Sequence, residues 1–356
     1  TDSAQVSLSF TAEQKVITLG SDGTGSIMNQ GLLQTPASIN KFAVEFNIIG
    51  GVQVATSSSH GATFISYGVS GNENEFYAWK PNDLTIRIGG HEYATGIDTT
   101  DGQSHRYSIL WDSASGHLEV LVDGKPTFSQ DNVAKGYQIP GNGVLALAQD
   151  QDHFATESSA HATANHGFAS NDAYHGQVFG AAIATNVDVD KSALANAPLG
   201  KVVDKASGLV VDIQMDAHGH PVDLTGHHQL STAGSVTSSI VNVDTSIATP
   251  NSNALLHLNP TITPPSDTKD IISKVEMTGF VAGTVVSDGH GHSVTIGHMS
   301  DRVDIKDWDH STLTAQLPGG TAHNMNIELV VTVHGPAGAV TTSSASPLVL
   351  DPTQPI

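Results

Sequence analysis

The chain has 356 residues, and its 35 acidic and 14 basic side chains give a formal net charge of −21. Such a surface repels phosphate groups, which excludes a protein that binds nucleic acid or anionic lipid through them. No apolar stretch reaches the ~18 residues of a membrane helix, so we expect no membrane insertion. The acidic surface can bind divalent cations, or it can serve solubility alone.

Short segments of alternating apolar and polar residues recur through the first half of the chain. They are residues 6–10, 42–49, 62–67, 75–79, 84–88, 106–111, 117–122 and 176–183. Turn pairs such as Asp101-Gly102 and Asp123-Gly124 separate them. A period of two indicates strands with one buried face, and many strands without intervening helices predict an all-β sandwich.

Three regions follow from this pattern. Residues 1–195 form the first predicted sandwich, which ends near the short helix-like stretch 187–197. Residues 196–262 form a β-rich connecting segment and linker, whose prolines block regular strand pairing. Residues 263–356 contain about seven short strands with turn signals, a pattern typical of a smaller immunoglobulin-like (Ig-like) sandwich.

Three polar clusters predict a calcium site that holds one or two ions. One cluster directly follows the predicted buried strand 143–148. Calcium takes ~6–8 oxygen ligands, so carboxylates, amides and a carbonyl from separate loops suit it. The simpler alternative is that these are turn residues, since Asp and Asn are common in turns. The predicted ligands are Glu73, Asn74, Asp150, Gln151, Asp152, Asn171 and Asp172.

Aromatic side chains near these clusters are candidates for contact with a sugar ring. Trp79 precedes a turn and is predicted to be partly exposed, whereas Trp111 lies in an alternating strand and is predicted to belong to the core. Tyr77 and Tyr174 are further candidates for stacking. His153 lies in a loop rich in Ala, Ser, Thr and His, where it could contact a ligand.

Two other chemistries find little support in the sequence. The chain has 19 histidines, but the His-rich pairs 218/220, 227/228 and 290/292 lack a third ligand at a zinc-binding spacing. Polysaccharide hydrolysis on a β-sandwich needs two close carboxyl groups, and no Glu-x-Asp-x-Glu run occurs. The Gly-x-Ser-x-Gly context of a nucleophilic serine is also missing. We therefore expect a binding protein and not an enzyme.

Several motifs of the first half resemble those of pentraxins and occur in the same order. The resemblance covers roughly residues 36–190 and extends loosely to laminin-G and concanavalin-like sandwiches. It implies a two-sheet jelly roll that binds a ligand through calcium. The motifs are Phe64-Ile-Ser-Tyr-Gly68, Asn72-Glu-Asn-Glu75, Asp101 to Arg106 followed by Leu110-Trp111, Val122-Asp-Gly-Lys125, Gly143 to Asp152 and Ala173 to Gln177.

The pentraxin resemblance also implies roles for individual residues. Glu73-Asn74 and the run from Asp150 to Asp152 would bind the first calcium, with Gln151 contributing its backbone carbonyl. The second calcium would use the positions of Ala169 and Asp172. Alanine has no oxygen in its side chain, so Asp172 or the neighbouring Asn171 would have to compensate.

The C-terminal region resembles a different family. Residues 277–289 and 304–313 are similar to Ig-like repeats of large bacterial RTX adhesins, which are exported by type I secretion. This resemblance implies part of a longer extracellular protein on a bacterial surface, with neighbouring adhesin domains, and the lack of cysteine agrees with a bacterial source. The partner would be a glycan, or another anionic or polyol ligand, on a cell or surface. In the competing hypothesis the whole chain is a stalk, and calcium stiffens joints near Asp188, Asp190 and Asp351.

Overall fold

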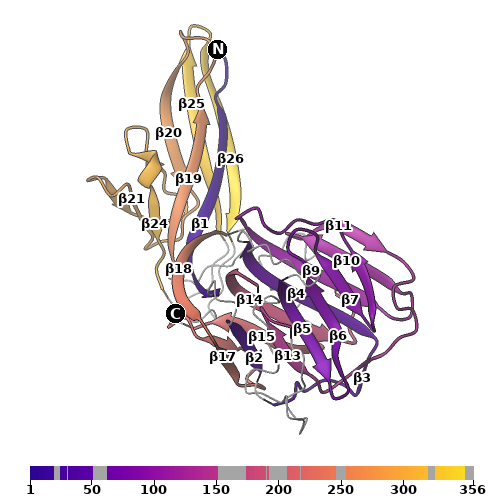
Figure 1. The fold of residues 1–356 in the computed structure, drawn as a ribbon. Helices are drawn as coiled ribbons and strands as arrows, with labels where there is room; N and C mark the ends of the chain where they lie inside the picture. The colour runs from indigo at the N-terminus through magenta and orange to yellow at the C-terminus, as the bar shows by residue number, and fades with distance from the viewer. Residues whose placement is uncertain are drawn as a thin grey trace. The chain divides into compact units, whose positions relative to one another are not determined.

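The computed structural model describes residues 1–19, 25–29, 31–50, 62–150, 174–189, 191, 207–216, 218–245, 254–319 and 325–348. Strands dominate these residues (Figure 1), which form two compact units, 15–240 and 1–14 with 241–356. The described part contains no helix that is long and apolar enough to cross a membrane. The dominance of strands confirms the predicted all-β fold.

One sheet of the unit 15–240 is built around β4 (Lys41–Gly50), which pairs with β9 on one side and β14 on the other. All of these pairings are antiparallel, as expected for strands joined by short turns. The sheet runs in the order β11-β10-β9-β4-β14 and continues through β15 to β16. The remaining bounds are β9 (Ser104–Asp112), β10 (His117–Val122), β11 (Lys125–Gln130), β14 (Gly176–Thr185), β15 (Leu209–Met215) and β16 (Pro221–Asp223).

The second sheet of this unit has the order β17-β2-β13-β5-β6-β7-β8. A two-residue pair, β3 (Ser38–Ile39) with β12 (Ile139–Pro140), lies outside both sheets. The strands of the second sheet are β17 (Leu230–Ala233), β2 (Ser26–Asn29), β13 (Val144–Leu147), β5 (Thr63–Val69), β6 (Asn72–Trp79), β7 (Thr85–Ile88) and β8 (His91–Ala94).

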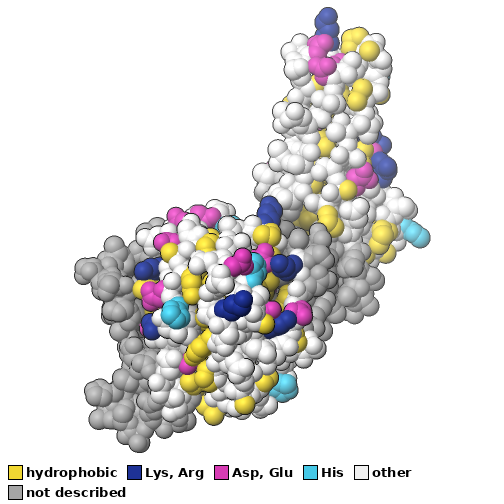
Figure 2. Space-filling model, turned by 90° about the vertical axis from the view of Figure 1, so that its right-hand side faces the viewer, with side chains coloured by type: hydrophobic (Ala, Val, Ile, Leu, Met, Phe, Trp, Pro, Cys, Tyr) yellow, Lys and Arg dark blue, Asp and Glu magenta, His cyan; other side chains and the backbone are white. Residues whose placement is uncertain are grey.

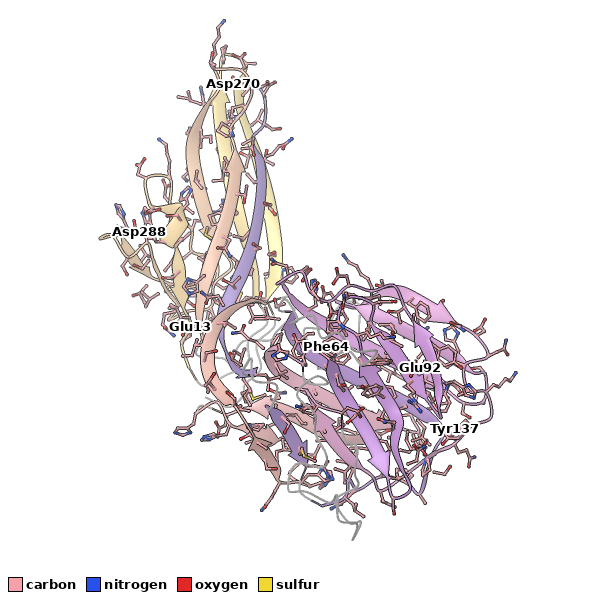
Figure 3. All side chains as sticks on the ribbon, viewed as in Figure 1. Glu13, Phe64, Glu92, Tyr137, Asp270 and Asp288 are labelled. Carbon is pink, nitrogen blue, oxygen red and sulfur yellow. The ribbon has the colours of Figure 1, made fainter. Side chains whose placement is uncertain are left out.

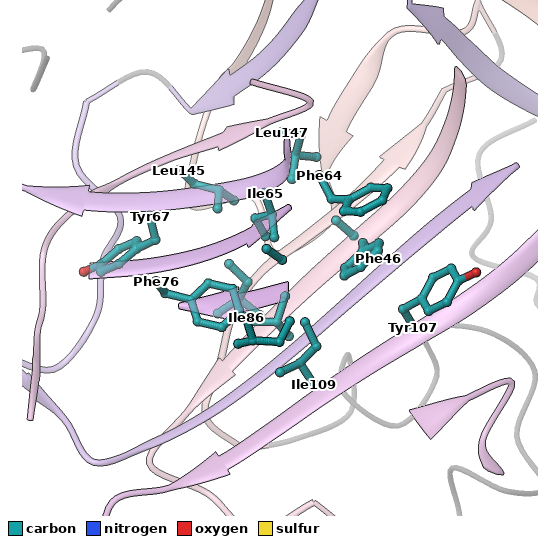
Figure 4. Packing of buried hydrophobic residues seen from close by; sticks show 14 of the residues in the cluster. Phe46, Phe64, Ile65, Tyr67, Phe76, Ile86, Tyr107, Ile109, Leu145 and Leu147 are labelled. Atoms are coloured by element: carbon teal, nitrogen blue, oxygen red, sulfur yellow. The ribbon is translucent and has the colours of Figure 1, made fainter. Parts of the chain in front are cut away.

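The two sheets share one core of buried apolar side chains (Figure 4). Phe46 of β4 stacks against Phe64 of β5 and Tyr107 of β9, with ring centroids 5.2 and 5.3 Å apart. Burying a large apolar side chain of this kind contributes ~2–3 kcal/mol. Because side chains alternate along a strand, each sheet also has an outer face that points away from this core.

The predicted boundaries at residues 195 and 262 differ from the observed units. Residues 207–240 are not a connector, because β15 pairs with β14 of the first sheet and β17 pairs with β2 of the second. Conversely, Gln5–Ala12 of β1 (Gln5–Leu19) pair with β19 (Leu255–Thr263), so the first residues of the chain belong to the other unit. Such pairings join remote parts of the chain and leave no local signal in the sequence.

The unit of residues 1–14 and 241–356 is a smaller β-sandwich with its own core. Met277, Phe280 and Leu329 are completely buried in it. Its similarity to Ig-like repeats stays a prediction. Its further elements are β18 (Val236–Asp244, beginning in the other unit), β20 (Ile271–Thr278), β21 (Val285–Ser287), β22 (Ser293–Thr295), β23 (Val303–Asp304), the 3-10 helix η1 (His310–Thr312), β24 (Thr314–Gln316), β25 (Met325–Gly335) and β26 (Gly338–Leu348).

Candidate functional site

The chain turns back over the outer face of the second sheet directly after β13. Ala148 has a left-handed backbone (φ 67°), and its N–H still donates to the carbonyl of Phe64 at 2.8 Å. The backbone carbonyl of the following residue, Gln149, accepts a 3.1 Å hydrogen bond from Ser66 Oγ. Ser66 points away from the core, because its neighbours Ile65 and Tyr67 belong to the core. Asp150 directly follows this contact with Ser66 and is only 7% exposed.

The polar motif of residues 72–75 begins the neighbouring strand β6. Glu75 is buried and accepts hydrogen bonds from Asn72 Nδ2 at 2.7 Å and from the hydroxyl of Tyr137 (labelled in Figure 3) at 2.5 Å. Burial and, next, the bond to this carboxylate raise the pKa of Tyr137 to about 12. Asn74 differs from Glu75, because its Oδ1 is buried and has no hydrogen-bond partner. A buried amide oxygen without a partner is costly, and a bound cation would remove that cost.

Only part of the predicted calcium site falls on described residues. Asn74 lies in strand β6, and Asp150 lies in the turn after β13. In the sheet, one strand, β5, separates β6 from β13. Glu73 is the second residue of β6. In the described ranges, no three His, Cys, Asp or Glu side chains are grouped to hold a metal ion. Convergence of all the ligands stays a prediction, since Gln151, Asp152, Asn171 and Asp172 lie outside the described residues.

The aromatic candidates are buried. Tyr77 and Trp79 are 4% and 5% exposed, and their rings stack with centroids 5.4 Å apart. Because Trp79 is only 5% exposed, the predicted partial exposure of this residue is wrong. Lys80 Nζ lies 4.1 Å from the centroid of the Trp79 ring. Tyr174 belongs to the core, where its hydroxyl donates to the carbonyl of Ile49. None of these three rings presents a face to a sugar in this structure, and His153 lies outside the described residues.

Two of the His-rich pairs hold turns together through aspartates. His228 is almost completely buried; its Nδ1 lies 2.8 Å from Asp223, and its Nε2 accepts the backbone N–H of Gln34 at 3.0 Å. In the other unit, Nδ1 of His292 lies 2.6 Å from the carboxylate of Asp288 (labelled in Figure 3). Asp288 also accepts three backbone N–H groups, and these bonds together outweigh burial and hold its pKa well below the usual range. These bonds give His228 and His292 a structural role in their turns.

The roles of Ser66 and Ala148 could not be found from the sequence. The left-handed backbone that starts the fold-back occurs at an alanine, whereas Gly and Asn are the residues that normally signal it. Ser66 looks like any polar residue of an alternating strand. Only the hydrogen bond between Ser66 and Gln149 reveals that this serine fixes the start of the acidic run.

Residues 38–164 match the Pentaxin family. The match includes β13, β5 and β6 and the start of the acidic run, and it confirms the pentraxin-like fold predicted from the motifs in this region. Human C-reactive protein is 30% identical over 100 residues, which are 28% of this chain and 44% of that protein. Human Pentraxin-4 is 28% identical over 156 residues, or 42% of this chain and 30% of that protein. The chain thus spans less than half of the length of these relatives.

Solved structures with a similar architecture include a heptameric SAP-like pentraxin from Limulus polyphemus. Its TM-score is 0.46 at 14% identity, over 64% of this chain and 95% of that chain. The LG4-5 domains of the mouse laminin alpha1 chain have a TM-score of 0.37 at 12% identity, over 95% of this chain and 78% of that chain. At these TM-scores neither similarity supports a statement about function.

Proposed function

We propose that the sandwich of residues 15–240 is a calcium-dependent module that binds carbohydrate or a ligand bearing phosphate or carboxylate groups. The observation that carries this proposal is the fold-back of Gln149 and Asp150 over the outer face of the second sheet, within a region that matches the Pentaxin family. The unpartnered amide oxygen of Asn74, on the same sheet, supports it. The proposed activity is binding without catalysis.

The donor set of this region fits calcium, which prefers carboxylate, amide and carbonyl oxygens. Asn74 and Asp150, with Glu73, Gln151 and Asp152, would hold the first ion, and Asn171 and Asp172 would hold a second. When bound, calcium neutralises carboxylates that otherwise repel one another and leaves open positions for ligand oxygens. We expect a calcium dissociation constant of ~10⁻⁴–10⁻³ M, the range of extracellular modules.

We further propose that the chain belongs to a bacterial cell-surface adhesin that is secreted by a type I pathway and attaches cells to surfaces or to a host. The acidic surface, the lack of cysteine and the adhesin-like motifs of residues 277–289 and 304–313 support this setting. The second candidate is a stalk that calcium only stiffens. Binding of glycans that requires calcium favours the first candidate, because a stalk has no need for such a ligand.

The test combines glycan-array binding with thermal unfolding, each in calcium and in chelator. The wild-type chain should bind glycans only in calcium and should melt at a higher temperature in millimolar calcium. The double variant Asp150→Ala/Asp152→Ala should lose both effects. The matched control Glu92→Gln/Asp307→Asn removes two acidic charges from surface positions on β8 and in the loop after β23, and it should keep both. Unchanged calcium stabilisation in the Asp150/Asp152 variant would refute the assignment.

A further inference from the structure

A groove of about 440 Å³ lies on the outer face of the first sheet of the unit 15–240. Asn74 lies on a strand of the other sheet, and Asp150 follows a strand of that sheet. Aliphatic side chains line the floor, namely Ala43 of β4, Leu110 of β9, and Val187 and Val189 after β14. The volume falls within the ~300–1,000 Å³ of ligand pockets. The floor is therefore mainly aliphatic.

One side of the groove carries Lys41 between two carboxylates. Lys41 Nζ lies 3.6 Å from Asp112 and makes a short hydrogen bond to Asp188. The register places Lys41 beside Asp112 on the neighbouring strand, and Ala43 beside Leu110. The side chain of Asp188 is 89% exposed, so its carboxylate remains open to a second cation.

The other side carries Glu119, His117 and Asp131. Lys191 Nζ lies 2.7 Å from Glu119, and His117 Nδ1 lies 2.7 Å from Asp131. Glu119 sits directly beside Leu110 in the register of β9 and β10. The side chain of Asp131 is 77% exposed. Each side of the groove thus ends in a carboxylate that faces solvent.

The charges of the rim do not cancel. Four carboxylates, those of Asp112, Glu119, Asp131 and Asp188, stand against the ammonium groups of Lys41 and Lys191. Among the carboxylates and ammonium groups, two negative charges are in excess. Figure 2 shows one face of the molecule, on which hydrophobic atoms lie among acidic, basic and histidine side chains. An apolar floor between two acidic sides favours an elongated apolar ligand with a positive charge at each end.

We propose that this groove binds an aliphatic polyamine. One terminal ammonium group binds near Asp112 and Asp188, and the other binds near Asp131. The central ammonium group of a triamine binds near Glu119, which lies beside Leu110, and the methylene segments lie over Ala43, Leu110 and Val189. Lys41 of β4, Asp112 of β9 and His117 of β10 lie side by side in the register, so Lys41 and His117 are two strand spacings or ~10 Å apart, which a chain of the length of spermidine can span. The binding needs no calcium and is independent of the site on the opposite sheet.

Isothermal titration calorimetry with spermidine tests the proposal on the full chain, in chelator and about 0.15 M salt, where the Debye length is only ~8 Å. The double variant Asp131→Asn/Asp188→Asn changes two exposed side chains and should weaken binding by about tenfold or more. The control Glu92→Gln/Asp307→Asn removes the same charge elsewhere on the chain. It should change the affinity by less than about twofold, because distant exposed charges are screened.

A second variant tests the floor. Val189→Lys places a cation in the groove at a half-buried position and should abolish the binding of spermidine, while the melting temperature shows that the chain still folds. A monoamine with a chain of equal length should bind about tenfold more weakly than spermidine, because it reaches only one acidic side. Wild-type affinity in both groove variants overturns the proposal. So does an equal loss in the control, since binding would then follow only the net charge of −21.

Discussion

Both ring nitrogens of His105 contact carboxylates, Nδ1 at 2.7 Å from Asp123 and Nε2 at 2.9 Å from Asp101. A ring with a carboxylate at each nitrogen is stable only as the imidazolium, because both nitrogens must donate. The bond to Asp123, followed by the bond to Asp101, raises the pKa of His105 to about 9 against the effect of burial. The ring therefore holds the turn between β10 and β11 to the loop before β9 as a charged group.

This pKa predicts how stability depends on pH. His105 binds its proton more tightly in the folded chain, so its contribution is complete below the ordinary histidine pKa of ~6.5. It is lost as the pH rises towards about 9. We expect the unfolding free energy of the wild type to fall by ~2 kcal/mol across this window, after allowance for partial exposure. His105→Gln should remove most of that fall in urea titrations, and an equal fall in both proteins would contradict the assignment.

At the scale of elements, β15 and β17 complete the sandwich, although both lie beyond its predicted end. Val211 and Ile213 of β15 are buried in the core, and β17 covers the edge of β2, which itself pairs with β13. An uncovered strand edge exposes unpaired backbone groups and invites association. The strand that leads to Asp150 is therefore supported by residues more than 80 positions further along the chain.

This support predicts different behaviour for two lengths of chain. A polypeptide of residues 15–195 lacks β15 and β17 and loses at least two buried side chains at ~2 kcal/mol each. We expect it to aggregate or to lack cooperative unfolding, whereas residues 15–240 should unfold in one transition. Circular dichroism with thermal melting, and gel filtration, measure the difference. Cooperative, monomeric behaviour of residues 15–195 would show that β15 and β17 are dispensable.

At the scale of the whole molecule, each of the two units has its own apolar core. Separate cores favour separate unfolding transitions in calorimetry. If calcium binds near Asn74 and Asp150, millimolar calcium should raise only the transition of the unit 15–240. The Asp150→Ala/Asp152→Ala variant should lose this shift and keep the other transition in place. A shift confined to the other unit would instead favour the stalk hypothesis.

Much of the fold could be predicted from the sequence, because the alternation of apolar and polar residues marks a strand within a short stretch of chain. The alternation in residues 42–49 and 106–111 marks strands whose core side chains, such as Phe46 and Tyr107, the structure finds buried. The order of the pentraxin-like motifs predicted the region that the family match covers. The candidate site was predictable only as a set of oxygen-bearing residues, and most of those after Asp150 lie outside the described residues.

The strand periodicity, the acidic surface and the chemical nature of the donor oxygens can be read from the amino-acid order, because each depends on residue type and short spacing. Tertiary structure alone decided that Trp79 and Tyr174 are buried, because exposure depends on what other parts of the chain cover. It also decided that residues 1–14 pair with β19, and that Gln149 turns back to Ser66. These features arise from contacts between residues far apart in the chain, which no local pattern encodes.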